Sequence, residues 1–477
     1  MKRYNSLEDV HQDIKAGLVT CRDLVNYYLK NIEQKKHLNA YLEVFAEEAL
    51  AQAEVVDRKI AAGTAGRLAG MVVGIKDVLA YKDHSLQSSS KILDGFKSLY
   101  TATAVQRVLD EDAIIIGRQN CDEFAMGASN ETSAFGPTLN DFDNTRVPGG
   151  SSGGSAVAVQ ADLCLASLGS DTGGSVRQPA AFCDIIGFKP TYSRISRYGL
   201  IAYASSFDQI GTLTRSVEDA ALLLEIMAGA DENDSTVSHK PVPSYTAELN
   251  NNRSYRIGYI SDSMESEGLQ PEIKDAMNNA IDRLRAEGHT VESVDFHYLD
   301  YIVPTYYILT TAEASSNLSR YDGVKFGYRS PDATDLVSMY KKTRAQGFGH
   351  EVQKRIMLGT FVLSADYYDA YYTKAQRVRR LIKEKTEELL SQYDFLITPT
   401  TPTTAFPLGG NDADPLAIYL ADIFTVQASL SGVPAISVPA GYDNKGLSIG
   451  LQIITKPFAE SQLFAFSKLV NETIVAV

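Results

Sequence analysis

The feature of this sequence that most limits its fold is the alternation of short apolar runs with longer helical patterns. Three runs bounded by glycine or aspartate are expected to be buried strands, at residues 71–81, 113–118 and 163–170. Apolar residues that recur at three- and four-residue steps predict helices at residues 101–112, 151–162 and 216–230. Strands that alternate with helices in this way predict an α/β layered fold.

The rest of the chain continues this pattern. Further helices are predicted at residues 23–34, 46–63, 271–289 and 364–392. Further strands are predicted at residues 255–261 and 290–296, at the start of 394–408, and as a closing pair at 435–442 and 447–456. Ser216 and Asp219 have the spacing of an N-cap and its partner. Residues 232–254 are polar and rich in Pro and Asn, so they form either a domain linker or a long surface loop.

Composition excludes several classes of protein. The 477 residues carry a net charge of −14, which argues against binding of a nucleic-acid backbone over a broad surface. The four cysteines form no CxxC pair and no zinc-ligand spacing, so free thiols in a reducing cytoplasm are expected. No signal-peptide core is present, and no stretch approaches the roughly 18 uninterrupted apolar residues of a membrane span. The chain is therefore expected to be cytoplasmic, without contact with a membrane.

Two glycine-serine clusters, at residues 149–155 and 169–175, are the most distinctive local feature. Neither cluster is followed by the lysine of a phosphate-binding loop, and the apolar residues between them do not suit a flexible linker. The second cluster follows a predicted strand, and Pro179 stands where the first turn of a helix would be. Its glycines could present converging backbone N–H groups beside the Ser175 hydroxyl, as an oxyanion hole requires. A glycine turn with a capping serine explains this cluster equally well.

The first cluster also matches G-x-S-x-G around Ser151, the pattern of a nucleophile elbow. An elbow requires a strand directly before it, whereas a loop is predicted there, so this interpretation is the weaker one. None of the seven histidines lies in a glycine-rich or strand-end context that would suggest a base. Lys76 lies in an apolar run, where loss of solvation would lower its pKa and leave a neutral amine. Alternatively, Lys76 pairs with Asp77 or extends outward to solvent.

Taken together, these residues resemble the amidase signature family. The resemblance rests on Lys76 in GIKD, Ser151 in PGGSSGGS, and Ser175 in GSDTGGSVRQPAAFC. It implies Ser175 as nucleophile, Ser151 as bridging serine after a cis peptide bond, and Lys76 as base. It also implies an oxyanion hole at the N–H groups of Thr172, Gly173, Gly174 and Ser175. The implied fold is one large domain with a central mixed β-sheet covered by helices on both faces. Its parts would be a helical segment at 1–65, a signature core at 66–230 and a C-terminal part at 255–477.

Within that family, the chain resembles the A subunits of bacterial aspartyl/glutamyl-tRNA amidotransferases, on DEFAMGASNETSAFG and two later stretches. The resemblance implies glutamine hydrolysis, with glutamine bound by Tyr306, Arg355 and Asp422. It further implies the B and C subunits of the amidotransferase as partners, with tRNA held mainly by the former. ATP and Mg²⁺ would belong to the partner, and this chain would need no cofactor or metal. A free-standing amidase of small amides and a catalytically silent scaffold are the alternatives. Residues 88–90 are assigned no role.

Overall fold

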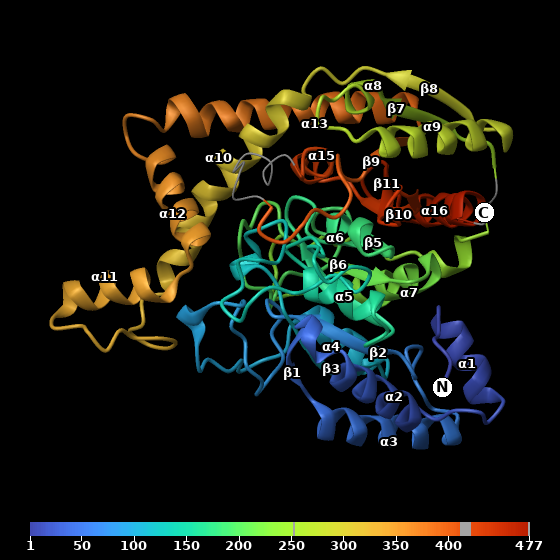
Figure 1. Cartoon of the computed structure of the whole chain (residues 1–477), viewed down its shortest axis with the longest axis horizontal. Helices are drawn as coiled ribbons and strands as arrows, with labels where there is room; N and C mark the ends of the chain where they lie inside the picture. Colours follow the sequence, from blue (N-terminus) through green and yellow to red (C-terminus); the bar gives the residue numbers. More distant parts are fainter. Residues whose placement is uncertain (251–252, 411–420, 476–477) are drawn as a thin grey trace.

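The computed structural model describes residues 1–250, 253–410 and 421–475. Its strands are β1 (Tyr41–Val44), β2 (Val72–Lys76), β3 (Ile114–Gln119), β4 (Ala166–Asp171), β5 (Ile186–Lys189), β6 (Gln209–Thr214), β7 (Arg256–Ile260), β8 (Thr290–Val294), β9 (Phe395–Pro399), β10 (Ala435–Tyr442) and β11 (Ser448–Ile454). The described residues form one eleven-stranded sheet, in the order β1-β3-β2-β4-β6-β5-β10-β11-β9-β7-β8. In Figure 1 the sheet runs from the N-terminal elements at the bottom to β7 and β8 at the top.

The sheet is mixed, as the family resemblance implies. β2 runs parallel to β3 and β4, and β7 runs parallel to β8 and β9. Between these two groups, from β4 through β6, β5, β10 and β11 to β9, each strand is antiparallel to the next. The predicted closing strand pair, β10 and β11, is therefore confirmed, but it lies in the middle of the sheet rather than at an edge.

The helices agree with most of the sequence patterns. They are α1 (Leu7–Lys15), α2 (Cys21–Gln34), α3 (Ala46–Ala62), α4 (Thr103–Asp110), α5 (Gly153–Gln160), α6 (Arg177–Phe182), α7 (Val217–Met227), α8 (Ser261–Met264), α9 (Pro271–Ala286), α10 (Leu299–Asn317), α11 (Leu336–Gly347), α12 (His350–Val362), α13 (Lys374–Gln392), α15 (Val426–Ser431) and α16 (Glu460–Val475). Short 3₁₀ segments are η1 (Lys36–Leu38), η2 (Lys91–Leu93), η3 (Glu123–Ala125), η4 (Tyr245–Glu248) and η5 (Leu318–Arg320). The predicted cap of α7 is confirmed, because the Ser216 side chain accepts from the Asp219 N–H.

One predicted helix is shorter than expected. The sequence predicts a helix from 364 to 392, but residues 363–368 form turns, a π-helical turn (η6) spans Asp369–Thr373, and α13 begins only at Lys374. The Tyr367 ring packs against Phe361 of α12, with ring centres 4.4 Å apart. The chain thus turns between α12 and the long helix, where this aromatic contact forms.

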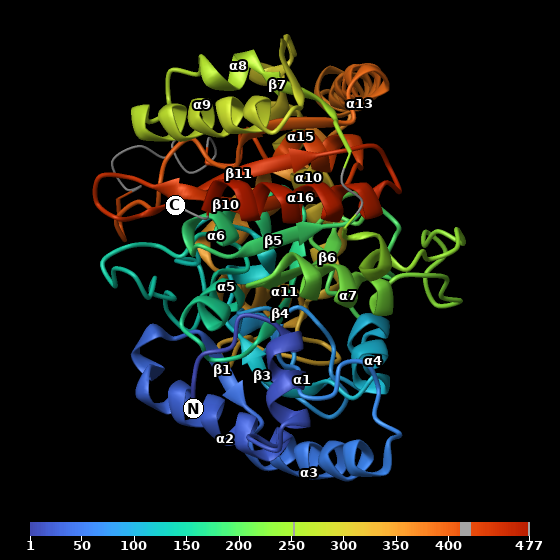
Figure 2. The same ribbon diagram turned by 90° about the vertical axis from the view of Figure 1, so that its right-hand side faces the viewer.

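Helices cover both faces of the sheet. Phe188 of β5 packs against Phe464 of α16, with ring centres 4.6 Å apart. The next residue back, Gly187, points the other way, where a Cβ would lie 2.5 Å from Ala180 of α6. Since successive strand residues face opposite sides, α6 and α16 lie on opposite faces. Figure 2 shows the stacked strands with α7 and α16 on the viewer's side.

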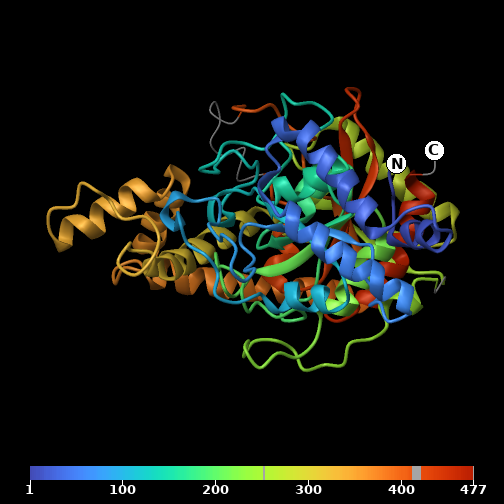
Figure 3. The same ribbon diagram turned by 90° about the horizontal axis from the view of Figure 1, so that it is seen from below.

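A helical arm extends from one side of this layered body. It consists of α10, α11 and α12, and α11 projects furthest from the sheet in Figures 1 and 3. Residues 232–254 connect α7 to β7, two elements of the same layered body, and contain η4. No helix in the described ranges has the length and apolar character needed to cross a membrane.

Candidate active site

Lys76 lies at the end of β2, a strand buried along its whole length. Its Nζ donates to three serine hydroxyls, those of Ser151 at 2.7 Å, Ser152 at 2.9 Å and Ser170 at 2.9 Å. Burial lowers the pKa of Lys76 to about 8, although nearby acidic groups oppose the shift. A substantial fraction of this amine is therefore neutral near physiological pH, and a neutral amine can accept a proton.

The alternative role for Lys76, a pair with Asp77, does not occur. Asp77 instead forms a buried ion pair with Arg118, whose Nη1 lies 2.6 Å from the carboxylate. No histidine of the described ranges forms a hydrogen bond with Lys76, Ser151 or Ser175. Lys76 is thus the basic side chain that contacts the Ser151 hydroxyl.

Ser151 lies in the loop that leads into α5 and is completely buried. The Gly150–Ser151 peptide bond is cis, as the family resemblance implies. A Cβ on Gly150 would lie 2.1 Å from Asp122 Oδ2, so only glycine fits against this carboxylate. Residues 141–150 contain no strand, so the nucleophile-elbow interpretation is not supported.

Residues 172–175 of the second cluster lie in the loop between β4 and α6, as predicted, and Pro179 lies in the first turn of α6. We call residues 172–175 the glycine loop. The Ser152 N–H donates to the Ser175 carbonyl at 3.1 Å, which joins the two clusters in space. Gly174 has φ +142°, and a Cβ there would lie 2.2 Å from Thr425 Oγ1.

The backbone N–H groups of the glycine loop are available for a ligand. Within the described part of the chain, the N–H groups of residues 172–175 donate no hydrogen bond to another residue. Buried N–H groups are almost always paired, so four consecutive unpaired ones are exceptional. Beside them, Ser175 is 7% exposed and Thr172 is 1% exposed. The loop thus has the donors that a developing oxyanion requires.

Tyr306, Arg355 and Asp422 come from three separate segments, and Tyr306 contacts the glycine loop. The Tyr306 hydroxyl, from α10, lies where a Cβ on Gly173 would approach to 2.6 Å. Arg355, from α12, donates through Nε to Glu351 at 2.7 Å and through Nη1 to Tyr203 Oη at 2.9 Å. Asp422 lies just before α15, and its buried Oδ1 has no hydrogen-bond partner among the described residues.

The charges of Asp422 and Arg355 interact. Burial raises the pKa of Asp422 to about 8; the nearby Asp171 carboxylate adds to the rise, and the Arg355 charge opposes it. A buried carboxylate oxygen without a partner is costly unless a ligand completes it. The Arg355 guanidinium and, once ionised, the Asp422 carboxylate match the two charged groups of an amino acid.

Sequence reasoning missed several residues that surround the site. Ser152 and Ser170 bind the lysine amine, Asp122 packs on Gly150, and Asp208 accepts from the Thr172 hydroxyl at 2.7 Å. Ser152 and Ser170 lie within the glycine-serine stretch itself, so their position in the sequence could have indicated a place in the site. Asp122 and Asp208 carry no periodic or local signal, because their contacts span long sequence separations.

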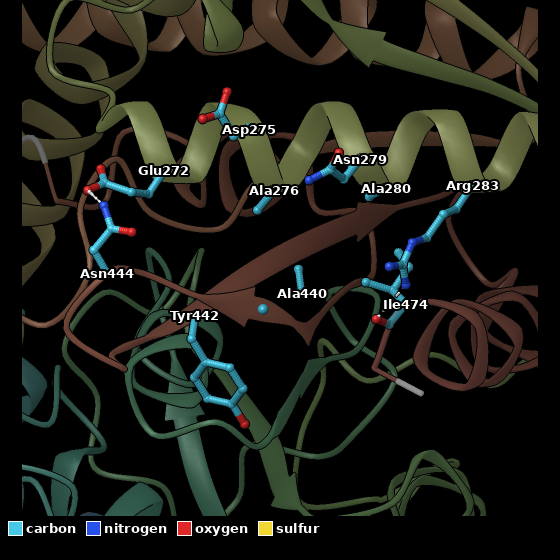
Figure 4. Close-up of a pocket in the computed structure, with 11 residues that line it drawn as sticks. Glu272, Asp275, Ala276, Asn279, Ala280, Arg283, Ala440, Tyr442, Asn444 and Ile474 are labelled. Atoms are coloured by element: carbon cyan, nitrogen blue, oxygen red, sulfur yellow. Dashed lines mark hydrogen bonds between the residues drawn. The ribbon is translucent and has the colours of Figure 1, made fainter. Parts of the chain in front are cut away.

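A separate cavity of about 370 Å³ lies between α9 and β10, beside the end of α16 (Figure 4). Glu272 accepts there from Asn444, while Arg283 donates to the carbonyl groups of Thr473 and Ile474. None of the predicted site residues lines this cavity. The described residues contain no group of three or more His, Cys, Asp or Glu side chains that could hold a metal ion.

The α/β sheet and its buried lysine–serine site are those of an amidase. A family model described as Amidase matches residues 23–464, so the chain belongs to the amidase family. It is 51% identical to the A subunit of Glutamyl-tRNA(Gln) amidotransferase from Chlorobium luteolum, over 98% of this chain and 96% of that protein. It is 49% identical to the protein of the same name from Chlorobaculum tepidum, over 98% of this chain and 97% of that protein.

Solved structures agree with this assignment. The crystal structure of the Glutamyl-tRNA(Gln) amidotransferase A subunit from Thermotoga maritima matches with a TM-score of 0.79 and 40% identity, covering 95% of this chain and 91% of that chain. The peptide amidase of Stenotrophomonas maltophilia matches with a TM-score of 0.83 and 27% identity, covering 98% and 96%. The predicted α/β fold and the amidase resemblance are therefore confirmed.

Proposed function

We propose that this chain is the glutamine-hydrolysing subunit of a tRNA-dependent amidotransferase. The observation that carries the proposal is the buried Asp422 carboxyl, which lies near the Arg355 charge and has an oxygen without a partner among the described residues, in a fold that also buries Lys76 against its serines. An amide that also carries an α-carboxylate and an α-ammonium fits this arrangement. The similarity to the A subunits of Glutamyl-tRNA(Gln) amidotransferases supports the same substrate.

In the proposed chemistry, neutral Lys76 draws a proton from Ser175 through the Ser151 hydroxyl, and Ser175 attacks the carboxamide carbon. The N–H groups of Thr172, Gly173, Gly174 and Ser175 stabilise the oxyanion of the tetrahedral intermediate. When the intermediate collapses, the C–N bond breaks and the proton returns to the departing ammonia. Water then attacks the acyl-enzyme by the same relay, and glutamate is released.

Recognition of glutamine would use the charges at its α-carbon. Arg355 would bind the α-carboxylate through its guanidinium, and Asp422 would pair with the α-ammonium through its unpartnered Oδ1. Tyr306 lies against Gly173 and would limit the space around the substrate's side chain. These groups place the carboxamide, rather than the charged end, at Ser175.

The ammonia would pass to the B and C subunits in a heterotrimer. A net charge of −14 agrees with a chain that leaves tRNA binding mainly to the first of these partners. ATP and Mg²⁺ would act in that partner, which would amidate Glu-tRNA(Gln), Asp-tRNA(Asn) or both. Such a role would place the complex in the cytoplasm.

Co-expression with the neighbouring genes tests this proposal. We expect a stable complex that converts Glu-tRNA to Gln-tRNA only when both ATP and glutamine are present. The Ser175→Ala variant should assemble equally well but lose the glutamine-dependent reaction while free ammonia still supports it. Steady hydrolysis of many small amides by the isolated chain, with no complex formed, would instead indicate a free-standing amidase. An unchanged rate in Ser175→Ala would remove the nucleophile assignment.

A further inference from the structure

The segment 203–208 lies between the glycine loop and the residues proposed to recognise glutamine. It is a compact turn, in which the N–H groups of Phe207 and Asp208 both donate to the Ala204 carbonyl. Its two ends, Tyr203 and Asp208, are 1% and 2% exposed. Most buried polar groups are hydrogen-bonded, and the partners of these two residues show what the turn connects.

At one end, the Tyr203 hydroxyl accepts from Arg355 Nη1 at 2.9 Å and donates to Thr310 Oγ1 at 2.9 Å. Thr310 in turn donates to the Tyr306 carbonyl at 2.8 Å. The hydroxyl therefore has one donor and one acceptor in fixed positions. Arg355 Nη2 forms no hydrogen bond to any described residue, so this nitrogen is available to a ligand.

At the other end, Asp208 holds the glycine loop. Its carboxylate accepts from the Thr172 hydroxyl at 2.7 Å and from the N–H groups of Tyr203 and Ala204 at about 3 Å. The same carboxylate thus fixes Thr172 and the start of the turn that carries Tyr203. Movement of Arg355 relative to the glycine loop would break at least one of these bonds.

We propose that segment 203–208 is a specificity strut, in which Tyr203 and Asp208 are positioning residues. Tyr203 sets the Arg355 guanidinium to receive an α-carboxylate, and Asp208 keeps the glycine loop at a fixed distance from that guanidinium. When an amide carries an α-carboxylate, its carboxamide is thereby placed at Ser175. This inference rests on the proposed hydrolysis of glutamine and assigns the residues that set its selectivity.

The test uses three amides that differ only at the α-carbon, assayed with the full chain in the complex it forms. They are glutamine, glutaramate (which lacks the ammonium) and 4-aminobutanamide (which lacks the carboxylate). Loss of a hydrogen bond to a charged group corresponds to a change of about tenfold or more. Tyr203→Phe should raise KM about tenfold for glutamine and glutaramate, with kcat nearly unchanged, and should affect 4-aminobutanamide less than about twofold. Asp208→Asn should lower kcat on all three amides, because an amide NH₂ would face the N–H donors of Tyr203 and Ala204.

Tyr192→Phe is the matched control. The Tyr192 hydroxyl donates to the carbonyl of Ser205 in the same segment, at 3.0 Å, but does not touch Arg355. This variant should keep the wild-type ranking of the three amides, with all variants checked for wild-type thermal unfolding.

The outcomes separate the two proposals. An equal loss on all three amides in Tyr203→Phe, or no loss on any, would overturn the strut while glutamine hydrolysis stands. A wild-type chain that hydrolyses 4-aminobutanamide as well as glutamine would overturn the proposed recognition by Arg355, and the strut with it.

Discussion

Lys76 and Asp422 must both lose a proton for the proposed reaction, and both do so in the same pH range. Burial lowers the pKa of Lys76 to about 8 and raises that of Asp422 to about 8. The base must be neutral to accept a proton, whereas the carboxyl must be ionised to pair with an ammonium. Both conditions are met as pH rises through about 8, so the two groups act together rather than in opposition.

This coupling predicts the pH profile. Below pH 8, log kcat/KM for glutamine should rise with a slope that approaches two, because both groups of the free enzyme must lose a proton. Glutaramate has no ammonium to pair with Asp422, so its slope should be one, and Asp422→Asn should bring the glutamine slope down toward one. Initial rates between pH 6 and 9 measure these slopes. A profile that is flat over this range would contradict Lys76 as the base.

Glu123, a residue outside α12, forms a hydrogen bond at the start of that helix. The Glu123 carboxylate accepts from the N–H of Gly349, the N-cap of α12, at 2.8 Å and also from the Ser90 hydroxyl. Residues 88–90, which the sequence left without a role, thereby connect to the helix that carries Arg355. Burial raises the pKa of Glu123 to about 7.

A substitution at Gly349 tests this contact. A Cβ there would lie 2.4 Å from Glu123 Oε2, so Gly349→Ala should displace the carboxylate, cost about 1–2 kcal/mol and raise KM for glutamine. At Gly268 a Cβ would meet nothing within 4 Å, so Gly268→Ala should be neutral or slightly stabilising. Urea unfolding and glutamine kinetics on both variants measure the difference. Equal effects in the two variants would show that the Glu123 contact does not hold α12.

Elements with strong local patterns were predictable. β2 and β4 are short apolar runs, and Pro179 indicates the start of α6; Lys76 lies at the end of β2, and the glycine loop lies between β4 and α6. The roles of Lys76, Ser151 and Ser175 came from the family resemblance and stay predictions. Tyr203 carried no such signal, because its partner Arg355 lies 152 residues away in the sequence. For the same reason, the strand order could not be read from periodicity, since each pairing depends on contacts between distant segments.

At the scale of the whole molecule, Arg177 joins separate parts of the chain. It is fully buried and pairs with Asp171, and it also donates to the Thr425 carbonyl, Gln452 and Ser429. It thus connects β4, α6, α15 and β11. Removal of one partner from a buried ion pair leaves an uncompensated charge and open acceptors.

Arg177→Leu should therefore lower the free energy of unfolding by about 3–5 kcal/mol. Arg256→Leu is the matched control, because the Arg256–Glu292 pair is largely exposed, with side chains 56% and 46% accessible, and should change stability far less. The midpoint of urea unfolding, compared across both variants, measures the effect. A similar shift in the two variants would show that Arg177 does not link these elements.

The position of β10 and β11 has a consequence for biosynthesis. Of the strands in this sheet, these two are the last in the chain, yet they lie between β5 and β9 and join the two parts of the sheet. Until they leave the ribosome, the nascent chain holds β5 as an open strand edge, which is prone to unwanted pairing. Asp422, Thr425 and Gln452 also emerge late. A stop codon before β10 would therefore yield a chain that keeps Lys76, Ser151 and Ser175 but lacks Gln452, one of the buried partners of Arg177 beside the glycine loop.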